Sequence, residues 1–478
     1  MINTVEKEKL DKKKEEKVPG RTQTQVVINT SNIIDNADGQ IFPSVYAEVQ
    51  GTLGLDIVQL GYLTGVRSLL QAVSTPLWGW WSDKHSRKLV LAIGCFLWAI
   101  FTILMAFSSL FIDMLIYRAI TGIGLAVIVP TALSLIADYF LPQKRGKAFG
   151  WLGLTGVVGS IFGTLFATAI VQAYDKILGI DSWRFVFIVW GLVSIIIGIL
   201  VLIFTKDPIR GKMEPELQKV LTSEKAKRYR LNRSDYKTIL TNKTFLLIVL
   251  QGTAGSIPWN GIFFMIIWFE YMGFDPLVSG LIFSIMAIGA ALGNLFGGWI
   301  GDKAAKWSPN NGRILIAQIS VFAGIPLTYV IFFLIPMTIS SFLIYIIFGF
   351  ITGFLISWTA GGCNNPIFSE IFRPEIRSTV FSIDRVFEGS FAALGTVFVG
   401  LAAAAFGYIT PGIGEDISTL DPSIRLTNMT ALAWGMFLVA LIPWIICLIV
   451  YSFIYKTYPK DYETMRTILE DRAKQLEK

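Results

Sequence analysis

The sequence predicts an all-α membrane protein with twelve transmembrane helices in two pseudo-symmetric six-helix bundles. Composition is the first indication, since 53% of the 478 residues are hydrophobic and 16% are charged, whereas about a quarter of the residues in soluble proteins are charged. The second is a series of apolar runs, each near the roughly 20 residues that a helix needs to cross the hydrocarbon layer. The third is an internal repeat, described below. The runs cover approximately residues 25–49, 58–81, 89–109, 112–140, 147–172, 183–205, 243–271, 277–300, 313–336, 340–369, 378–407 and 428–455.

Charged segments between the runs divide the chain into five parts. A tail rich in Lys and Glu occupies residues 1–24, and the first six-helix bundle follows at 25–205. A basic linker at 206–241 leads to the second bundle at 242–457, and the chain ends in a charged helix at 458–478. We expect both tails and the linker to be cytosolic.

Short basic blocks set this orientation. A net charge of +7 is compatible with nucleic-acid binding, but Lys and Arg lie in short loops between apolar runs, which is typical of membrane topology. Most of them fall on the side that carries both tails. Because basic loops are retained in the cytoplasm, we expect a multi-pass protein of the cell membrane with both termini cytoplasmic and no nucleic-acid partner.

One basic block forms the turn between the second and third runs. Its glycine lets two helices approach closely, and its aspartate can meet a helix N-terminus or a nearby arginine. The sequence of this turn is Gly79-Trp80-Trp81-Ser82-Asp83-Lys84-His85-Ser86-Arg87-Lys88.

The same junctions recur in the second half of the chain. The spacing Gly79-x-x-x-Asp83 returns as Gly298-x-x-x-Asp302. Residues 138–149 also align with residues 370–381, with an acid, Phe, Pro, Arg and Phe at matching positions: Asp138 with Glu370, Phe140 with Phe372, Pro142 with Pro374, Arg145 with Arg377, and Phe149 with Phe381. Recurrence at matching helix junctions indicates two similar halves that face a central cavity.

These motifs resemble those of the major facilitator superfamily, over essentially residues 25–455. The basic turn is similar to the family's loop between helices two and three. Arg118-x-x-x-Gly122-x-Gly124 in the fourth run is similar to the family motif R-x-x-x-G-x-G.

Within the superfamily, the run Tyr117–Gly163 resembles the spinster-like branch, whose members are associated with lysolipid and sphingolipid export. The chain departs from that branch in the first helix, where Asn36 follows Asp35, and in the fourth helix, where Leu125 stands in place of a glutamate. Sugar-acid and drug-exporting branches remain alternatives.

The resemblance implies a secondary active transporter that moves a small or amphipathic organic solute by alternating access, coupled to protons as a symporter or antiporter. The sequence has no Walker A motif, so ATP is not the direct drive. A lysolipid or sphingolipid exporter, a lipid scramblase and a non-transporting sensor are the alternatives. We expect no enzyme activity, cofactor or bound metal, and a monomer whose partners are its solute, protons and membrane lipid.

Ionisable side chains inside apolar runs are costly in lipid, so each is expected to face a partner or a wet cavity. Asp35 and Asp38 lie three residues apart and share one face of the first helix. Two close carboxylates can bind a proton near neutral pH, and the alternative is structural pairing with Arg67 or Arg118. Each arginine is interpreted either as a structural partner of these acids or as a contact of the solute, because a permanent cation can attract an anionic solute.

Polar and aromatic residues of the seventh and tenth helices are candidates for lining the cavity: Gln251, Trp259, Asn260, Asn364 and Asn365. In the seventh helix, Gly255–Gly261 contains Pro258 and is expected to interrupt regular hydrogen bonding, as gating helices do.

A second set of charges is expected to close the cytosolic side through charge-assisted hydrogen bonds. The eleventh helix contributes three of them, for which direct solute binding is the alternative. The predicted gate comprises Asp83, Arg87, Lys88, Asp138, Arg145, Asp302, Glu370, Arg377, Asp384, Arg385 and Glu388.

Overall fold

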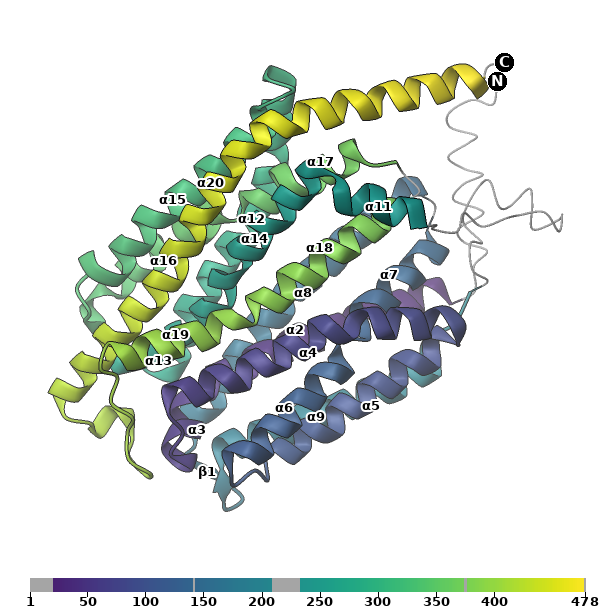
Figure 1. Ribbon diagram of the computed structural model, residues 1–478. Coiled ribbons are helices and arrows are strands. Elements are labelled where there is room, and N and C mark those ends of the chain that lie inside the picture. The colour runs from purple at the N-terminus through teal and green to yellow at the C-terminus, as the bar shows by residue number, and fades with distance from the viewer. Residues whose placement is uncertain (1–19, 141, 209–232, 374–375, 477–478) are drawn as a thin grey trace. The chain divides into compact units, whose positions relative to one another are not determined.

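The computed structural model describes residues 20–140, 142–208, 233–373 and 376–476, and these are almost entirely helical (Figure 1). The strands within these ranges are β1 (Lys176–Ile177) and β2 (Ile180–Asp181), which pair antiparallel. Each of the twelve predicted runs is helical. By length and composition, nine helices of the described chain can cross a membrane. The helices of the first, second and seventh runs fall outside that set.

Contacts divide the chain into two units. The first is Met1–Phe42 with Leu70–Arg228, and the second is Pro43–Leu69 with Tyr229–Lys478. Residues 43–69, which lie inside the predicted first bundle, therefore pack within the second unit.

Besides β1 and β2, the described residues of the first unit form seven helices, one of which, α4, begins in the second unit. Helix α2 packs on α8 and α9, and α5 packs on α6 and α9. The helices are α2 (Arg21–Ile41), α4 (Ile57–Lys84), α5 (Arg87–Met105), α6 (Phe111–Leu125), α7 (Ile128–Tyr139), α8 (Pro142–Ala173) and α9 (Ser182–Phe204).

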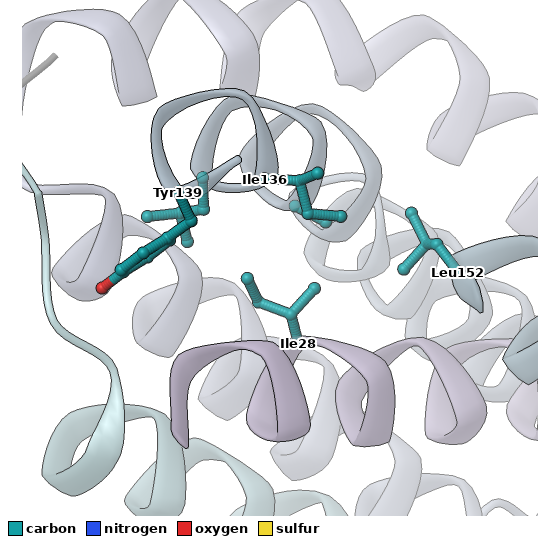
Figure 2. Packing of buried hydrophobic residues seen from close by; sticks show 6 residues of the cluster. Ile28, Ile136, Tyr139 and Leu152 are labelled. Atoms are coloured by element: carbon teal, nitrogen blue, oxygen red, sulfur yellow. The ribbon is translucent and has the colours of Figure 1, made fainter. Parts of the chain in front are cut away.

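The fourth predicted run is broken into α6 and α7. Pro130 has no N–H to give to the carbonyl of Ala126, which explains a break at residues 126 and 127. Below the break, α7 packs its apolar side against α2 and α8. Figure 2 shows this cluster, which contains Ile28, Ala132, Leu135, Ile136, Tyr139 and Leu152.

Helices α2 and α8 approach so closely that only glycine fits at their contact. A Cβ atom added at Gly159 would lie 2.2 Å from the carbonyl oxygen of Ile33, and one added at Gly163 would lie 2.4 Å from that of Ala37. At Gly153, on the same helix, a Cβ atom would meet nothing within 4 Å.

We expect Gly159→Ala to lower the free energy of unfolding by about 1–3 kcal/mol, the usual cost of overpacking, because the obstructing atom is a backbone oxygen that cannot rotate away. Gly153→Ala is the matched control and should be neutral or stabilising by up to about 1 kcal/mol, since alanine has the better helix propensity. Thermal unfolding of the two purified variants checks the difference. Equal melting temperatures would contradict the close approach.

The second unit contains the remaining elements. They are η1 (Pro43–Val45), α3 (Tyr46–Leu53), the start of α4, α11 (Arg233–Thr241), α12 (Lys243–Gly261), η2 (Ile262–Phe264), α13 (Met265–Tyr271), α14 (Pro276–Trp307), α15 (Gly312–Tyr329), η3 (Val330–Leu334), η4 (Ile339–Ser341), α16 (Phe342–Ile356), η5 (Ala360–Asn364), α17 (Asn365–Ile371), α18 (Arg377–Ala392), α19 (Leu394–Ala405), η7 (Ile417–Thr419) and α20 (Pro422–Leu476).

Packing inside this unit repeats that of the first. Helix α12 packs on α18 as α2 packs on α8, and α15 packs on α20 as α5 packs on α9. Likewise α12 packs on α20 as α2 packs on α9. The same pairs of helices are therefore in contact in each half, as the sequence repeat predicts.

Two details differ from the sequence prediction. The seventh run stays helical through Pro258 and changes to a 3₁₀ turn only after Gly261, so the interruption lies beyond the predicted segment. The charged C-terminal helix is not separate, because α20 runs without a break from the last span into it and bends along its length (Figure 1).

The end of α20 is fastened to its own unit. The hydroxyl of Thr244, at the start of α12, donates to Asp461 Oδ2 at 2.5 Å, and the hydroxyl of Tyr458 donates to Glu370 Oε2 at 2.5 Å. Residues 458–461 of α20 are thus part of the folded unit.

Candidate functional site

A cavity of about 310 Å³ lies inside the second unit, among α12, α15, α16, α18, α20 and the π-turn η5. Part of its wall is apolar, with Trp259 and Trp444 as the largest side chains. The polar part of the wall is formed by Gln251, Ser256, Thr359, Asn364, Arg385 and Glu388.

Small residues make the room for these side chains. A Cβ atom at Gly252 would lie 2.6 Å from Glu388 Oε1, and one at Gly255 would lie 3.2 Å from Cys447 Sγ. The π-turn η5 has the sequence Ala-Gly-Gly-Cys-Asn. Such turns are rare inside helices and occur often at functional sites. Here the turn brings Asn364 into the wall.

An ion pair on α18 is the charged feature of the cavity. Arg385 Nη1 donates to Glu388 Oε2 at 3.1 Å, one turn along the helix. The side chain of Arg385 is 61% exposed and that of Glu388 is 19% exposed. The carbonyl oxygen of Glu388 also accepts from the hydroxyl of Ser256 at 2.9 Å, which fixes α18 against α12.

Two amides complete the polar wall. Gln251 is 2% exposed, and its Nε2 has no hydrogen-bond acceptor among the described residues. Its backbone oxygen accepts from Cys447 Sγ at 3.1 Å. Asn364 is oriented by Tyr451, whose hydroxyl donates to Asn364 Oδ1 at 2.9 Å.

Three of the five predicted lining residues, Gln251, Trp259 and Asn364, lie in this wall. Asn260, on α12, and Asn365, at the start of α17, are half-buried and are not among the residues that line the cavity. The wall also includes Arg385 and Glu388, which were assigned to the cytosolic gate with solute contact as the alternative. Their neighbour Asp384 is 2% exposed and lies outside the wall.

The first unit buries the predicted acidic pair. Asp35 is 6% exposed and its Oδ1 accepts from Gln71 Nε2 at 3.1 Å. Asp38 is 3% exposed and its Oδ1 accepts from the hydroxyl of Thr102 at 3.5 Å.

The two predicted arginines are also buried, Arg118 in the first unit and Arg67 in the second. The guanidinium of Arg118 lies over the ring of Phe42, with 4.5 Å from its Cζ atom to the ring centroid, and Arg118 is 1% exposed. Arg67 is 8% exposed on α4.

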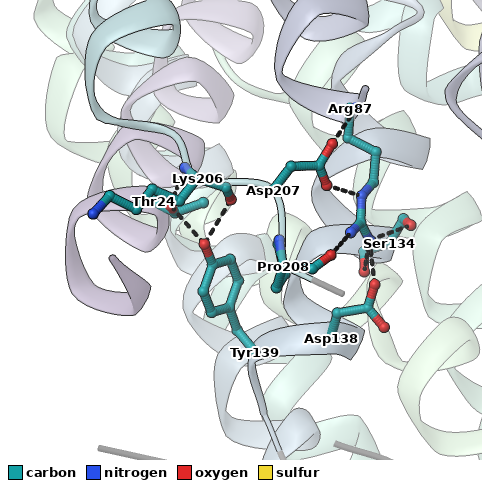
Figure 3. Close-up of polar contacts among 8 residues, drawn as sticks. All are labelled: Thr24, Arg87, Ser134, Asp138, Tyr139, Lys206, Asp207 and Pro208. Atoms are coloured by element: carbon teal, nitrogen blue, oxygen red, sulfur yellow. Dashed lines mark hydrogen bonds and ion pairs between the residues drawn. The ribbon is translucent and has the colours of Figure 1, made fainter. Parts of the chain in front are cut away.

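Arg87 organises the polar network of the first unit at the predicted cytosolic ends of its helices (Figure 3). It pairs with Asp138 and with Asp207, whose Oδ1 lies 2.6 Å from Arg87 Nε. Its other donors reach Ser134 and the carbonyl oxygen of Pro208. Arg87 is 1% exposed, so these acceptors replace water almost completely.

The start of the predicted linker belongs to the same network. The backbone N–H of Lys206 donates to the hydroxyl oxygen of Thr24 at 3.0 Å, and the hydroxyl of Tyr139 donates to the carbonyl oxygen of Lys206 at 2.6 Å (Figure 3). Residues 206–208 are therefore folded onto the first unit.

The second unit repeats this arrangement around an arginine that was not predicted. Arg313, at the start of α15, pairs with Asp302 at 3.0 Å and with Glu370 at 3.2 Å. In the sequence repeat, Asp302 matches Asp83 and Glu370 matches Asp138. Arg313 was not predicted because the two halves differ in spacing. Arg87 follows Asp83 by four residues, whereas Arg313 follows Asp302 by eleven.

Four predicted gate residues remain, Lys88, Arg377, Asp83 and Arg145. Arg377 Nε donates to the carbonyl oxygen of Phe372 at 3.1 Å, which closes the turn before α18. Lys88 is half-buried beside Arg87. The side chains of Asp83 and Arg145 lie outside the described part of the structure.

A chain of side-chain hydrogen bonds at the opposite end of the second unit was also missed. The hydroxyl of Tyr408 donates to Gln50 Oε1 at 2.8 Å and lies 2.6 Å from the hydroxyl of Tyr271. Burial raises the pKa of Tyr408 well above its ordinary value, so the hydroxyl keeps the proton that it donates. Arg425 fixes the far end by donating to the carbonyl oxygen of Tyr271 at 3.0 Å.

Apolar helices in two similarly packed halves, with a polar cavity in the second, define the protein as a transporter of the twelve-helix type. The family model described as Major Facilitator Superfamily matches residues 29–396. The chain belongs to that family. It is therefore an integral, multi-pass membrane protein, and a transporter rather than an enzyme.

Individual relatives agree with the predicted resemblance to the spinster-like branch. The chain is similar to Protein spinster of Drosophila melanogaster, with 27% identity over 249 residues, 51% of this chain and 39% of that protein, so it spans well under half of that relative's length. It is also similar to a D-galactonate transporter of Escherichia coli O6:H1, with 24% identity over 307 residues, 60% of this chain and 69% of the relative.

A crystal structure of a bacterial homolog to the human lysosomal transporter Spinster, in an inward-facing and unoccupied conformation, has the same fold. The TM-score is 0.79 at 20% sequence identity, over 93% of this chain and 98% of that one.

Proposed function

We propose that the protein is a secondary active transporter that moves a small or amphipathic organic solute by alternating access and couples this movement to protons. The observation that carries the proposal is the cavity in the second unit, where Arg385 and Glu388 meet polar amides and tryptophans. Ionisable groups inside membrane helices are expensive, and they mark solute and proton pathways. The cavity is the solute site of the second half.

The buried carboxyls of the first unit are the proton site. Asp35 and Asp38 lie on one side of α2 and are each less than a tenth exposed. Asp35 Oδ1 accepts a hydrogen bond from the amide of Gln71, and Asp38 Oδ1 accepts one from the hydroxyl of Thr102. Buried carboxyls inside membrane helices are the groups that proton relays use. Arg118, the buried cation of the same unit, adjusts the charge around this pair, and Arg67 keeps solute or proton contact as its proposed role.

Alternating access requires polar contacts that can form and break at each side of the membrane. The networks around Arg87 and Arg313 are the cytosolic contacts, together with the other charges assigned to the cytosolic gate. The chain formed by Gln50, Tyr408 and Tyr271 is the opposite contact, and it holds residues 43–69 in the second unit.

The relatives and the topology suggest the setting. Since the names of the relatives include spinster and a D-galactonate transporter, lipid-like solutes and sugar acids are the first solutes to test. The distribution of Lys and Arg supports cytoplasmic termini in the cell membrane. We propose that the monomer is the working unit.

Uptake into proteoliposomes tests the proposal. With the full chain reconstituted, radiolabelled D-galactonate, a lysolipid and an amphipathic cation are each offered with and without an imposed pH gradient. We expect saturable uptake of one probe that rises with the gradient and falls when a protonophore collapses it. Saturable uptake that ignores the gradient would exclude proton coupling, and lipid movement without saturable uptake would indicate a scramblase.

A further inference from the structure

Two donor groups in the cavity wall are not fully used. Gln251 lines the cavity, is 2% exposed, and has an Nε2 group without an acceptor among the described residues. A buried donor that loses water and gains no acceptor costs free energy. A ligand that brought an acceptor oxygen to this amide would recover it.

Arg385 is the second donor. A guanidinium has five N–H groups in a planar fork that fits a carboxylate through two parallel bonds. In the described chain, Arg385 makes one hydrogen bond, to Glu388, and its side chain remains 61% exposed. Its fork is therefore occupied at one point only.

Glu388 holds Arg385 from the same helix. Its carboxylate lies beside α12, since a Cβ atom at Gly252 would come within 2.6 Å of its Oε1. Gln251, Arg385 and Glu388 are all among the residues that line the cavity. Asp384, the next acid on α18, is not part of the wall and does not face a ligand there.

The rest of the wall is apolar and aromatic. Trp259, Val321, Ile356 and Trp444 lie around the cavity with the polar group. A ligand that satisfies both parts has an acidic head with acceptor oxygens and an apolar body.

We propose that this cavity binds the carboxylate of an amphipathic organic acid, with Arg385 and Gln251 as the donors and Glu388 as the internal group that the ligand displaces from Arg385. The inference deepens the proposed transport function and rests on it for treating the cavity as a solute site. Bound ligand would form the two-point contact with Arg385 that Glu388 does not make, because carboxylate and guanidinium match as forks.

Binding to the purified full chain, measured by calorimetry without any gradient, tests the inference. The probes are phenylpropionate, its primary amide and phenylpropylamine, which share one apolar body and carry an anionic, a neutral and a cationic head. We expect the carboxylate to bind at least about tenfold more tightly than the amide, the scale of one charge-assisted hydrogen bond.

Variants identify the residues. Arg385→Gln should remove the preference for the carboxylate, and Arg385→Lys should retain part of it, because lysine keeps the charge without the fork. Glu388→Gln should tighten carboxylate binding by about tenfold, since the competing carboxylate is gone. Gln251→Leu should weaken it, and Lys460→Gln, which removes an exposed charge from α20, is the control and should change nothing.

Three outcomes would overturn the inference. The first is equal binding of the acid and the amide. The second is tighter binding of the amine than of the acid, with this preference lost in Glu388→Gln. The third is weaker binding of the carboxylate by Glu388→Gln than by the wild type. The test is independent of the transport assay. Carboxylate preference without gradient-driven uptake would refute proton-coupled transport alone, whereas gradient-driven uptake of a carboxylate solute that Arg385→Gln leaves unchanged would refute the carboxylate site alone.

Discussion

Asp35→Asn should abolish solute uptake driven by a pH gradient, down to the level of empty liposomes. Asn is isosteric with Asp and can still accept from Gln71, whose Nε2 lies 3.1 Å from Asp35 Oδ1, but it cannot bind and release a proton. Solute counterflow at equal pH on both sides should persist, because exchange of labelled for unlabelled solute needs no net proton release. Uptake and counterflow in the same proteoliposomes provide the measurement.

The control for this variant is Asp56→Asn. Asp56 is exposed and accepts from the backbone N–H of Gln59 at 2.7 Å before α4, a bond that Asn can keep. Its uptake should equal that of the wild type. Undiminished gradient-driven uptake by Asp35→Asn would remove Asp35 from proton coupling. Loss of counterflow together with uptake would instead indicate that Asp35 has a structural role.

Arg87→Gln should have the largest effect on stability, with a loss of about 3–5 kcal/mol, the cost of leaving a buried ion pair without one partner. Arg87 is 1% exposed and holds two carboxylates, those of Asp138 and Asp207. Without the guanidinium these carboxylates repel each other, and the carboxylate of Asp138, whose side chain is 12% exposed, regains little water. Thermal unfolding of the purified variant should show a large fall in melting temperature.

Two companion variants test this explanation. Asp138→Asn introduced together with Arg87→Gln should recover part of the lost stability, because it removes one uncompensated charge. Arg313→Gln should cost less than Arg87→Gln, since its partner Asp302 is 67% exposed and can regain water, whereas the Arg87 partner Asp138 is 12% exposed. An Arg87→Gln melting temperature equal to that of Arg313→Gln would contradict the assignment of the difference to burial.

Sequence reasoning located the helices because the signal for them is local. A run of apolar residues of sufficient length is a helix in lipid, wherever the rest of the chain lies. The repeat of Asp138 as Glu370 was readable for the same reason, since both acids stand at fixed offsets from a Pro and an Arg. Pro130 lacks a backbone donor and so indicated the break in the fourth run, but the pattern of apolar residues does not reveal it.

The candidate site was only partly readable, because it depends on contacts between residues far apart in the chain. Gln50 and Tyr408 are separated by 358 positions and are joined by one hydrogen bond. Arg385 and Glu388 were recognised as unusual charges, but their position in a cavity wall depends on which side of α18 meets α12. Arg313 escaped notice because its partners are brought together by a turn and not by a fixed spacing.

Because the C-terminal part of α20 is hydrogen-bonded to α12, a label on it can report movement of the helices that line the cavity. Asp461 is tied to the first turn of α12, and Trp444 and Cys447, earlier on the same α20, stand in the cavity wall. All three native cysteines are buried, so a thiol introduced at the exposed Thr467 offers a selective point for a fluorescent label. Such a label, placed at a distance from the solute, would follow the tilt of α20 during each cycle while leaving the binding chemistry untouched.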